Sequence, residues 1–219
     1  MIYKNFFKRI IDFTLALIAL LILSPILIIC MVVLLLTGEH YVFYFQKRIG
    51  KNNQPFSIWK FATMLKNSPN IGTGTITTRN DPRVLPFGSF LRKTKLNELP
   101  QIFNVLFGSM SVVGPRPLVE KHFDMYSEEV KDKIGEMTPG ITGIGSIVFR
   151  DEEEIVSQGE DPREIYKQKV APYKGALELW YGQNISFMVD VKIMILTFWI
   201  IIFSDSELHY KWLKNLPSK

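Results

Sequence analysis

Long apolar stretches lie near both ends of the chain and enclose a segment of mixed character. Residues 13–36 carry no charged side chain, and they exceed the roughly 20 residues that a helix needs to cross a hydrocarbon core. A second apolar run, residues 185–203, contains Asp190 and Lys192. Because a central charge costs a spanning helix about 2.5–3.5 kcal/mol, we expect the second helix to pack on the domain or to lie at a membrane surface, with these charges on its polar side.

The first apolar run is interrupted by Ser24 and Pro25. Proline removes a backbone donor and kinks a helix, and the Ser24 hydroxyl can bond to a carbonyl that the proline frees. The run is too long for the core of a cleaved signal peptide. Cations on both sides of it favour two cytoplasmic ends. These features predict a re-entrant helix-hairpin with its hinge at Ser24–Pro25, although a kinked spanning helix fits the same pattern.

The segment after the first run has the alternation of a soluble domain. Aromatic and β-branched residues predict strands at 41–50 and 56–64, and a Gly-punctuated strand is expected at 138–150. Apolar spacing predicts a helix that begins at Leu96 or Asn97, with Asn97 as its N-cap and Glu98 in its first turn. A further amphipathic helix is expected over 165–181, interrupted by Pro172 and Gly175. We therefore predict an α+β fold with a re-entrant membrane anchor at 1–39 and a cytoplasmic domain with amphipathic interface helices at 40–219.

Charge is unevenly placed along this domain. The 219 residues hold 26 Lys and Arg against 21 Asp and Glu, a formal net charge of +5. Residues 40–80 contain no acidic side chain, so this stretch suits an anionic partner, or else forms a solvated basic face. Its cations are Lys47, Arg48, Lys51, Lys60, Lys66 and Arg79. No nucleic-acid-binding motif accompanies them, and we expect no nucleic acid partner.

Two further motifs bear on chemistry. In "VVGPRP", Pro115 and Pro117 restrict the backbone around Arg116, which would hold the guanidinium ready for a bidentate phosphate contact unless it is simply an exposed turn arginine. The acidic run 151–154 reads as a solvated helix start, or as a source of carboxylates for a metal or a base. The single cysteine, Cys30, excludes a disulfide within the chain and a Cys/His metal cluster.

Several motifs occur in a characteristic order. They are the basic N-terminus, the apolar run broken at Ser24–Pro25, "FQKRIG", "FSIWKFATM", "DPRVLPFGSFLRKTKLNELPQIFNVLFGSMSVVGPRP" and "PGITG". Together they resemble the bacterial sugar transferases, the small monotopic polyprenyl-phosphate phosphoglycosyl transferases. The likeness extends over nearly the whole chain, and the block 81–117 is its most specific part.

The resemblance implies an enzyme at the cytoplasmic face of the bacterial inner membrane, anchored in membrane lipid by a re-entrant helix. Such enzymes use Mg²⁺ to move a sugar-1-phosphate from a UDP-sugar, here expected to be an acetamido sugar, to undecaprenyl phosphate, and they release UMP as the first membrane step of glycoconjugate or polysaccharide assembly. Their catalytic pair is Asp-Glu, which corresponds to Asn97 and Glu98, with Glu98 also a metal ligand. The substrate-binding residues carried over are Lys60, Arg83, Arg92, Pro115, Arg116 and Pro117. The resemblance also suggests a homodimer.

Two positions depart from the family pattern. Asn97 replaces the nucleophilic aspartate, and Ala62 replaces an arginine. Because an amide does not readily form an acyl-phosphate, four interpretations stay open. Glu98 acts as nucleophile or base, or a carboxylate of 151–154 takes over. Otherwise the chain is an engineered Asp-to-Asn variant, or a natural pseudo-transferase that serves as a membrane scaffold or substrate-binding protein.

Overall fold

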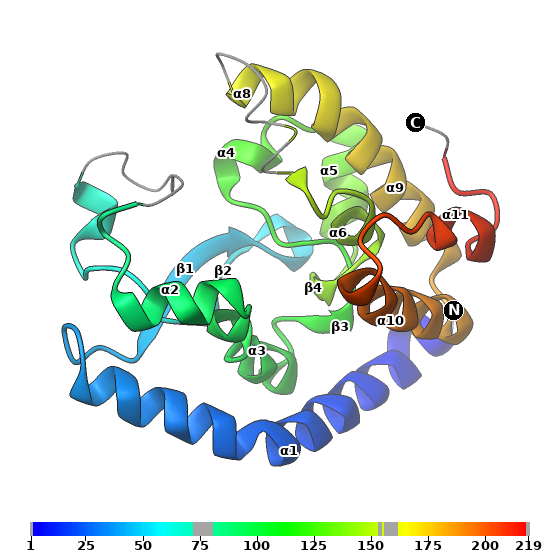
Figure 1. The fold of residues 1–219 in the computed structure, drawn as a ribbon. Coiled ribbons are helices and arrows are strands. Elements are labelled where there is room, and N and C mark those ends of the chain that lie inside the picture. Colours follow the sequence, from blue (N-terminus) through cyan, green and yellow to red (C-terminus); the bar gives the residue numbers. More distant parts are fainter. Residues whose placement is uncertain (1, 72–80, 153–154, 156–161, 218–219) are drawn as a thin grey trace.

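One long helix supports the rest of the molecule. The computed structural model describes residues 2–71, 81–152, 155 and 162–217. Helix α1 (Lys8–Leu36) runs along one side, and the other elements gather on the inner side of its bend (Figure 1). The strands are β1 (Phe43–Ile49), β2 (Pro55–Phe61), β3 (Ser111–Val113) and β4 (Gly140–Thr142). The other helices are α2 (Pro86–Lys93), α3 (Gln101–Phe107), α4 (Glu120–Phe123), α5 (Glu128–Gly135), α6 (Ile144–Val148), α8 (Pro162–Ile165), α9 (Ala171–Asn184), α10 (Phe187–Ile202) and α11 (Leu208–Trp212).

Helix α1 continues through Pro25 as a single bent helix. The missing proline N–H would have donated to the carbonyl of Leu21, and the Ser24 hydroxyl donates to that carbonyl instead, at 2.9 Å. The bend and its serine are thus explained by the sequence. A re-entrant path through a membrane stays a prediction, as does the division at residues 39 and 40.

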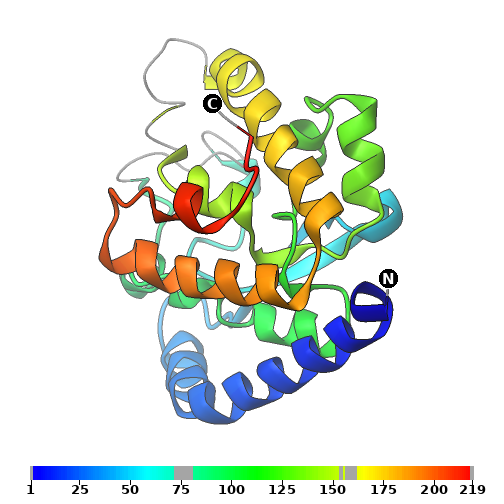
Figure 2. The same ribbon diagram turned by 90° about the vertical axis from the view of Figure 1, so that its right-hand side faces the viewer.

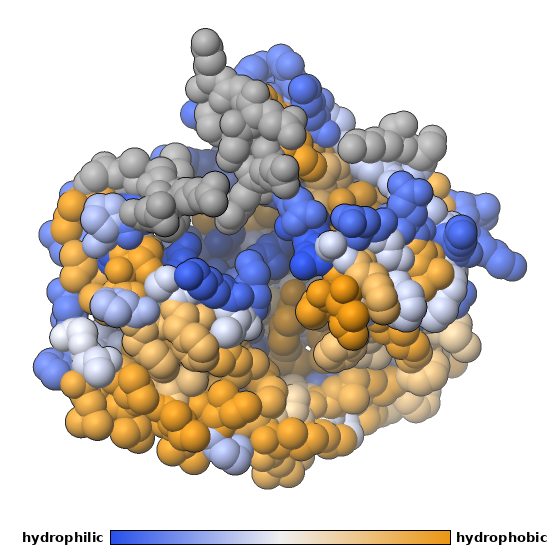
Figure 3. Space-filling view, in the orientation of Figure 1, coloured by the Kyte–Doolittle hydropathy of each residue, from blue (hydrophilic) through white to orange (hydrophobic). Residues whose placement is uncertain are grey.

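Most of the α1 surface is apolar and exposed. Within the described part of the chain, α1 is the one helix long and apolar enough to cross a membrane, with a mean hydropathy of 3.2 over its most apolar window. It buries only Asp12, Ala16, Leu27, Cys30 and Leu34 against the domain. In Figure 3 the lower edge of the molecule, along which α1 runs, is a mostly hydrophobic band. A band of this extent is typical of a surface that contacts lipid or another protein.

Helix α10 packs on the domain beside the N-terminal part of α1 (Figures 1 and 2). Its Asp190 is 3% exposed, and the carboxylate accepts from the Lys8 ammonium at 2.6 Å and from the hydroxyls of Tyr3 and Tyr181 at 2.7 Å each. The expectation that Asp190 marks the polar side of an interface helix is therefore wrong. Asp190 instead joins α10 to the N-terminal part of α1 and to α9, because a buried carboxylate must be paired with groups from neighbouring elements.

Strands β1 and β2 form an antiparallel hairpin. The register pairs Tyr44 with Lys60 and Arg48 with Phe56, so Arg48 and Lys60 share one face of the two strands. Asn52 and Asn53 adopt left-handed backbone angles, with φ of 56° each, in the turn between the strands. The two strands predicted from alternation are confirmed, with shorter bounds.

The predicted strand over 138–150 is wrong beyond its first residues. Only β4 is extended, parallel to β3, and α6 follows it directly. Glycine allows this close pairing, because a Cβ on Gly140 would lie 2.1 Å from the backbone nitrogen of Gly114. The pairing fixes the backbone that leads from β3 into the Pro115–Pro117 loop.

The segment 94–101 departs from its prediction in detail. Leu96–Glu98 form a 3₁₀ turn, and α3 begins only after Pro100, which occupies its N-cap position without a side-chain cap. Asn97 as N-cap is therefore wrong. The predicted helix over 165–181 is confirmed and continues past Gly175. The interruptions predicted at Pro172 and Gly175 are wrong, because both residues lie inside α9. A π-type turn over Tyr166–Val170 precedes α9 instead.

The main core lies between α5, α6, α9 and α10. Its fully buried side chains include Ile144, Leu177 and Ile193, each 0% exposed. A smaller core joins α1 to α3 and β2 through Ala16 and Val105, among others. A third core packs Leu96 of the 3₁₀ turn with Leu27 and Cys30 of α1. The hairpin and the 3₁₀ turn are thus held against the same helix that carries the exposed apolar band.

Candidate active site

A carboxylate and two cations from three separate elements meet at one point. Glu98 ends the 3₁₀ turn, Lys60 comes from β2, and Arg116 lies in the loop after β3. The Lys60 ammonium is 3.5 Å from Oε1 of Glu98, and the Arg116 guanidinium is 3.6 Å from the same oxygen. We call these three residues the Glu98 cluster. Both cations face a single carboxylate oxygen.

The local backbone brings Glu98 to this position. Lys95, which lies between α2 and the 3₁₀ turn, has a left-handed backbone conformation with φ 59°. The chain changes direction there, and the 3₁₀ turn packs against β2. Pro100 then starts α3 without needing a donor. The same close packing extends to α2, where a Cβ on Gly88 would lie 2.1 Å from the carbonyl oxygen of Thr63. Glu98 is thus held on a rigid corner between two helices.

Electrostatics keep Glu98 ionised. Burial acts to raise its pKa, but Arg116, Lys60 and Lys95 lower it more, and the pKa lies below the usual range of a glutamate. The pKa of Lys60 is lowered to about 8, mainly by burial and also by Arg48 and Arg116, while Glu98 acts to raise it. Burial and the neighbouring Arg116 likewise lower the pKa of Arg48 to about 10. At neutral pH the site therefore carries more positive than negative charge, which suits a polyanionic ligand.

Arg48 is a member of the site that sequence reasoning noted only as part of a basic stretch. Its guanidinium donates to the Pro117 carbonyl at 3.3 Å and to the Gln46 side chain at 2.7 Å, and it interacts electrostatically with Glu98 and Arg116. The signal was present in the period-2 alternation of the hairpin. Arg48 and Lys60 share a face once the strands are paired.

Asn97 lies beside the cluster, in the middle of the 3₁₀ turn. Its amide oxygen is buried and finds no hydrogen-bond partner among the described residues. An amide offers no nucleophilic oxygen for attack on phosphorus. Of the predicted catalytic pair, only Glu98 provides a carboxylate, while Asn97 presents an unpaired acceptor next to it.

The predicted binding residues Arg92 and Arg83 contact partners other than Glu98. Arg92, in the last turn of α2, reaches the Thr63 hydroxyl at 3.5 Å. Arg83 is buried and pairs with Asp81 at 2.6 Å, and it donates to the carbonyls of Ser68 and Ile71 at 2.7 Å each. The structure thus brings Lys60 and Arg116 to Glu98 and places Arg83 in a separate buried network. Roles for Arg83 and Arg92 in substrate binding stay predictions.

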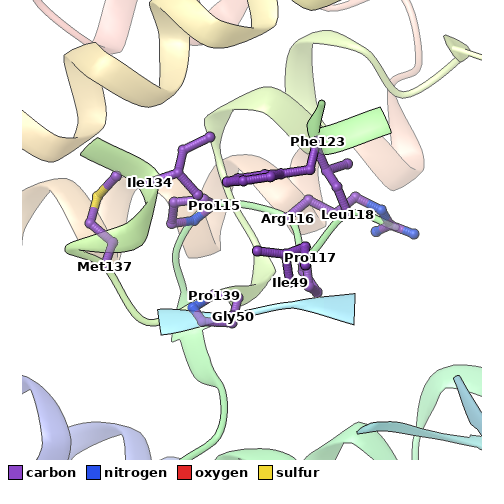
Figure 4. Close-up of a pocket in the computed structure, with 10 residues that line it drawn as sticks. All are labelled: Ile49, Gly50, Pro115, Arg116, Pro117, Leu118, Phe123, Ile134, Met137 and Pro139. Carbon is purple, nitrogen blue, oxygen red and sulfur yellow. The ribbon is translucent and has the colours of Figure 1, made fainter. Parts of the chain in front are cut away.

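The loop that carries Arg116 rests on an apolar pocket (Figure 4). The pocket is lined by Ile49, Gly50, Pro115, Arg116, Pro117, Leu118, Phe123, Ile134, Met137 and Pro139. The guanidinium of Arg116 points away from Ile134 and Met137. The side chain is 43% exposed. The apolar residues that line the pocket therefore pack against the loop. The Arg116 guanidinium, which pairs with Glu98, points away from them.

The acidic run does not reach the site in the part that the structure describes. Glu152 pairs with the ammonium of Lys174 on α9, and Asp151 is exposed. Glu153 and Glu154 lie outside the described residues. Across the described residues, no group of three or more His, Cys, Asp or Glu is close enough together to hold a metal ion. A cation here would depend on Glu98 and on oxygens that a ligand brings.

Comparison with known proteins identifies the family. The model of the bacterial sugar transferases matches residues 3–204. The chain belongs to the bacterial sugar transferase family. The match covers α1, the hairpin, the Glu98 cluster and α10, so the cluster lies within the family's shared fold.

Similar proteins include both longer and comparable chains. The "UDP-glucose:undecaprenyl-phosphate glucose-1-phosphate transferase" of Klebsiella pneumoniae is 35% identical over 196 residues, which cover 87% of this chain and 39% of that protein. The "Exopolysaccharide production protein ExoY" of Sinorhizobium fredii is 35% identical over 204 residues, with 87% and 83% covered. The "Uncharacterized sugar transferase EpsL" of Bacillus subtilis is 33% identical over 198 residues, with 90% and 88% covered. This sugar transferase chain thus spans about two fifths of the length of its UDP-glucose relative and most of the other two.

Proposed function

We propose that this chain transfers a sugar-1-phosphate from a UDP-sugar to undecaprenyl phosphate and releases UMP, at the cytoplasmic face of the bacterial inner membrane. The observation that carries the proposal is the Glu98 cluster, an ionised carboxylate between two cations, on a corner packed against a helix whose outer face is apolar. Both substrates are polyanions, and one of them is a lipid. Fixed cations bring like charges together, and the apolar band on α1 supports a position of the cluster close to a lipid surface.

Glu98 acts as the nucleophile in this proposal. One of its carboxylate oxygens attacks the sugar-bearing phosphorus, an O–P bond forms, and the bond to the uridine phosphate breaks, so UMP leaves with the electron pair. Undecaprenyl phosphate then attacks the same phosphorus and expels the carboxylate, which yields the sugar diphospholipid. Lys60 and Arg116 neutralise the phosphate charge that builds up in both steps. The alternative is direct attack by the lipid phosphate, with Glu98 as the base.

Magnesium would be held through Glu98 and the diphosphate oxygens. Mg²⁺ is commonly bound by one or two carboxylates together with substrate phosphates, so a single carboxylate suits it once the nucleotide is present. Bound there, it would neutralise phosphate charge. Lys60 and Arg116 contact the same carboxylate and would share that task.

The sugar is the least constrained part of the proposal. The Klebsiella pneumoniae relative is named for UDP-glucose, whereas the family resemblance led us to expect an acetamido sugar. We therefore propose a panel of UDP-glucose, UDP-galactose and UDP-N-acetyl sugars, each assayed for UMP release with undecaprenyl phosphate and Mg²⁺. The sugar with the highest kcat/KM defines the donor.

A labelling experiment and three variants test the mechanism. With the natural chain, a β-phosphate-labelled UDP-sugar and no lipid acceptor, we expect label on the peptide that contains Glu98. Glu98→Gln should lower UMP release by at least about a thousandfold, because it removes the attacking group. Glu129→Gln, an exposed acid on α5, is the matched control and should leave the rate unchanged. If the natural chain transfers no sugar and Asn97→Asp creates activity, the protein is a disabled copy and the scaffold function stands instead.

A further inference from the structure

The short strand β3, which leads into the loop that carries Arg116, has a different neighbour on each edge. On one edge it pairs with β4, and the Ser111 N–H donates to the Pro139 carbonyl at 2.8 Å. Successive residues of a strand direct their backbone groups to opposite edges, so the N–H of Val112 points away from β4. This second edge faces α1, which packs against β3 (Figure 1).

Asp12 of α1 occupies the second edge of β3. Its Oδ1 accepts from the Val112 N–H at 3.0 Å, and its Oδ2 accepts from the Ser111 hydroxyl at 2.7 Å. The interior carbonyls of a helix already bond along the helix, so the carboxylate takes the place that a neighbouring strand would have. Asp12 is buried, and a buried carboxylate is costly unless its oxygens are bonded in this way.

A buried network extends this contact to the next residue of β3. The Lys8 ammonium, one turn earlier on α1, lies 4.0 Å from Asp12 and pairs with Asp190 at 2.6 Å. The Tyr181 hydroxyl donates to Asp190 at 2.7 Å and lies 3.2 Å from the Val113 carbonyl. Two successive residues of the strand are thus held by groups that belong to α1 or that pair with it.

The backbone between β3 and Arg116 is closely packed. The Gly114 N–H donates to the Thr142 carbonyl at 2.9 Å. A Cβ on Gly114 would lie 2.4 Å from the carbonyl oxygen of Thr138. Proline precedes and follows Arg116 and restricts the backbone on both sides. A displacement of β3 therefore moves Arg116, whose guanidinium lies 3.6 Å from the Glu98 carboxylate.

The part of α1 that holds Asp12 also carries exposed apolar side chains. Ile10 and Phe13, on either side of Asp12 in the chain, are both exposed. In the proposed function this apolar face is seated in lipid, which fixes the position of the helix relative to the membrane surface. A carboxylate on the buried face then ties β3 to that position.

We infer that Asp12 is a positioning residue for Arg116: by bonding the second edge of β3, it fixes the loop after the strand to the anchor helix, so that the guanidinium faces Glu98 and the substrate phosphates. The inference deepens the proposed function and rests on it, because the position of Arg116 affects transfer only if phosphate binds at the Glu98 cluster. It gives α1 a role in addition to anchoring. The helix aligns the loop with the lipid surface, where the phosphate of the acceptor arrives.

The test uses the full chain in nanodiscs and begins with a double-mutant cycle. Asp12→Ala removes both acceptors, and we expect kcat/KM for the UDP-sugar to fall about tenfold, because the loop is no longer held in place. In the Arg116→Ala background the same change should cost less than about twofold, since two residues that act through one group are not additive. A merely structural role predicts that the two losses multiply.

Milder variants separate the bonds of Asp12 from its charge. In Asp12→Asn the amide can accept from the Val112 N–H and donate to the Ser111 hydroxyl oxygen, whose proton then turns to the Val113 carbonyl at 2.9 Å. We therefore expect this variant to keep most of the wild-type kcat/KM. Ser111→Ala leaves the Val112 bond in place and should lower kcat/KM about threefold; it replaces Asp12→Ala in the cycle if that variant does not fold. Val170→Ala, a buried change in the turn before α9, is the stability control and should lower the thermal midpoint without altering kcat/KM.

A second readout does not depend on sugar transfer. Phenylglyoxal modifies accessible arginines, and peptide mass spectrometry gives the rate at Arg116. We expect this rate to rise severalfold in Asp12→Ala and to stay at the wild-type value in Val170→Ala. Losses that multiply in the cycle, or an unchanged labelling rate at Arg116, would overturn the inference and leave the proposed function standing. If the wild-type protein transfers no sugar while the labelling rate rises, the proposed function fails and the positioning of Arg116 by Asp12 stands.

Discussion

The pH dependence of the Glu98 cluster can be worked out from Lys60. Burial, Arg48 and Arg116 hold its pKa at about 8, compared with 10.5 for a lysine free in water. The difference corresponds to about 3 kcal/mol against protonation. In the proposed reaction only the ammonium form neutralises phosphate. About nine tenths of the molecules carry it at pH 7 and about one tenth at pH 9. We therefore expect kcat/KM, which reports the free enzyme, to fall about tenfold between these values.

The same shift sets a stability trend of opposite sign. A lysine whose pKa is lower in the folded state than in the unfolded state binds fewer protons when folded. Its effect therefore favours folding increasingly as pH rises from about 8 toward 10.5. Activity and stability should move in opposite directions over this range, which separates loss of the ammonium from alkaline unfolding.

The decisive variant is Lys60→Arg. A guanidinium keeps its charge over the whole range, so the alkaline fall in kcat/KM should vanish even if the absolute rate is lower. Lys66→Arg, an exposed lysine after β2, should keep the wild-type profile. UMP release is measured from pH 6 to 9.5 with a constant ionic strength. A flat wild-type profile between pH 7 and 9, or an unchanged alkaline limb in Lys60→Arg, would refute the assignment of this titration to Lys60.

Two other predictions concern the anchor and its attachment. Asp190→Asn removes the negative charge that pairs with the buried Lys8 ammonium at 2.6 Å and leaves Asp12, at 4.0 Å, as the other carboxylate near it. We expect a loss of about 3 kcal/mol of stability, seen as a lower thermal midpoint by circular dichroism, whereas the exposed Asp205→Asn should have no effect. Pro25→Leu restores the backbone donor in α1, and a straight helix of this length exceeds a core about 30 Å thick. We expect a cysteine placed at Lys4 to become reactive toward an impermeant maleimide outside intact spheroplasts only in the Pro25→Leu background, and equal protection in both backgrounds would show that the bend does not set the topology.

Local chemistry explains what could be predicted from the sequence. The bend of α1 follows from Pro25, and the Ser24 bond to Leu21 repairs the carbonyl that proline frees. Alternation and turn residues predicted β1 and β2, because these strands have one neighbour and a short connection. The order of motifs marked the family. Each of these signals depends on residues close together in the chain.

Contacts between distant residues were decided by the tertiary structure. The charge of Asp190 suggested a polar helix face, but its partners come from a residue 182 positions away and from two tyrosines. The run after Gly140 looked extended, yet only the three residues that pair with β3 form a strand. The strand propensity of a single segment is a weak signal, and its packing against other elements outweighs it.

The sequence by itself determined which charged groups this chain carries and that one apolar helix would be bent. Only the folded chain decided that the cations of Lys60 and Arg116 meet at one carboxylate oxygen of Glu98. The physical reason is that a pKa or an ion pair depends on distance and burial, and both arise when elements far apart in sequence pack together. Asn97 shows the same division. That its side chain is an amide follows from the sequence, whereas the burial of its unpaired oxygen is a property of the fold.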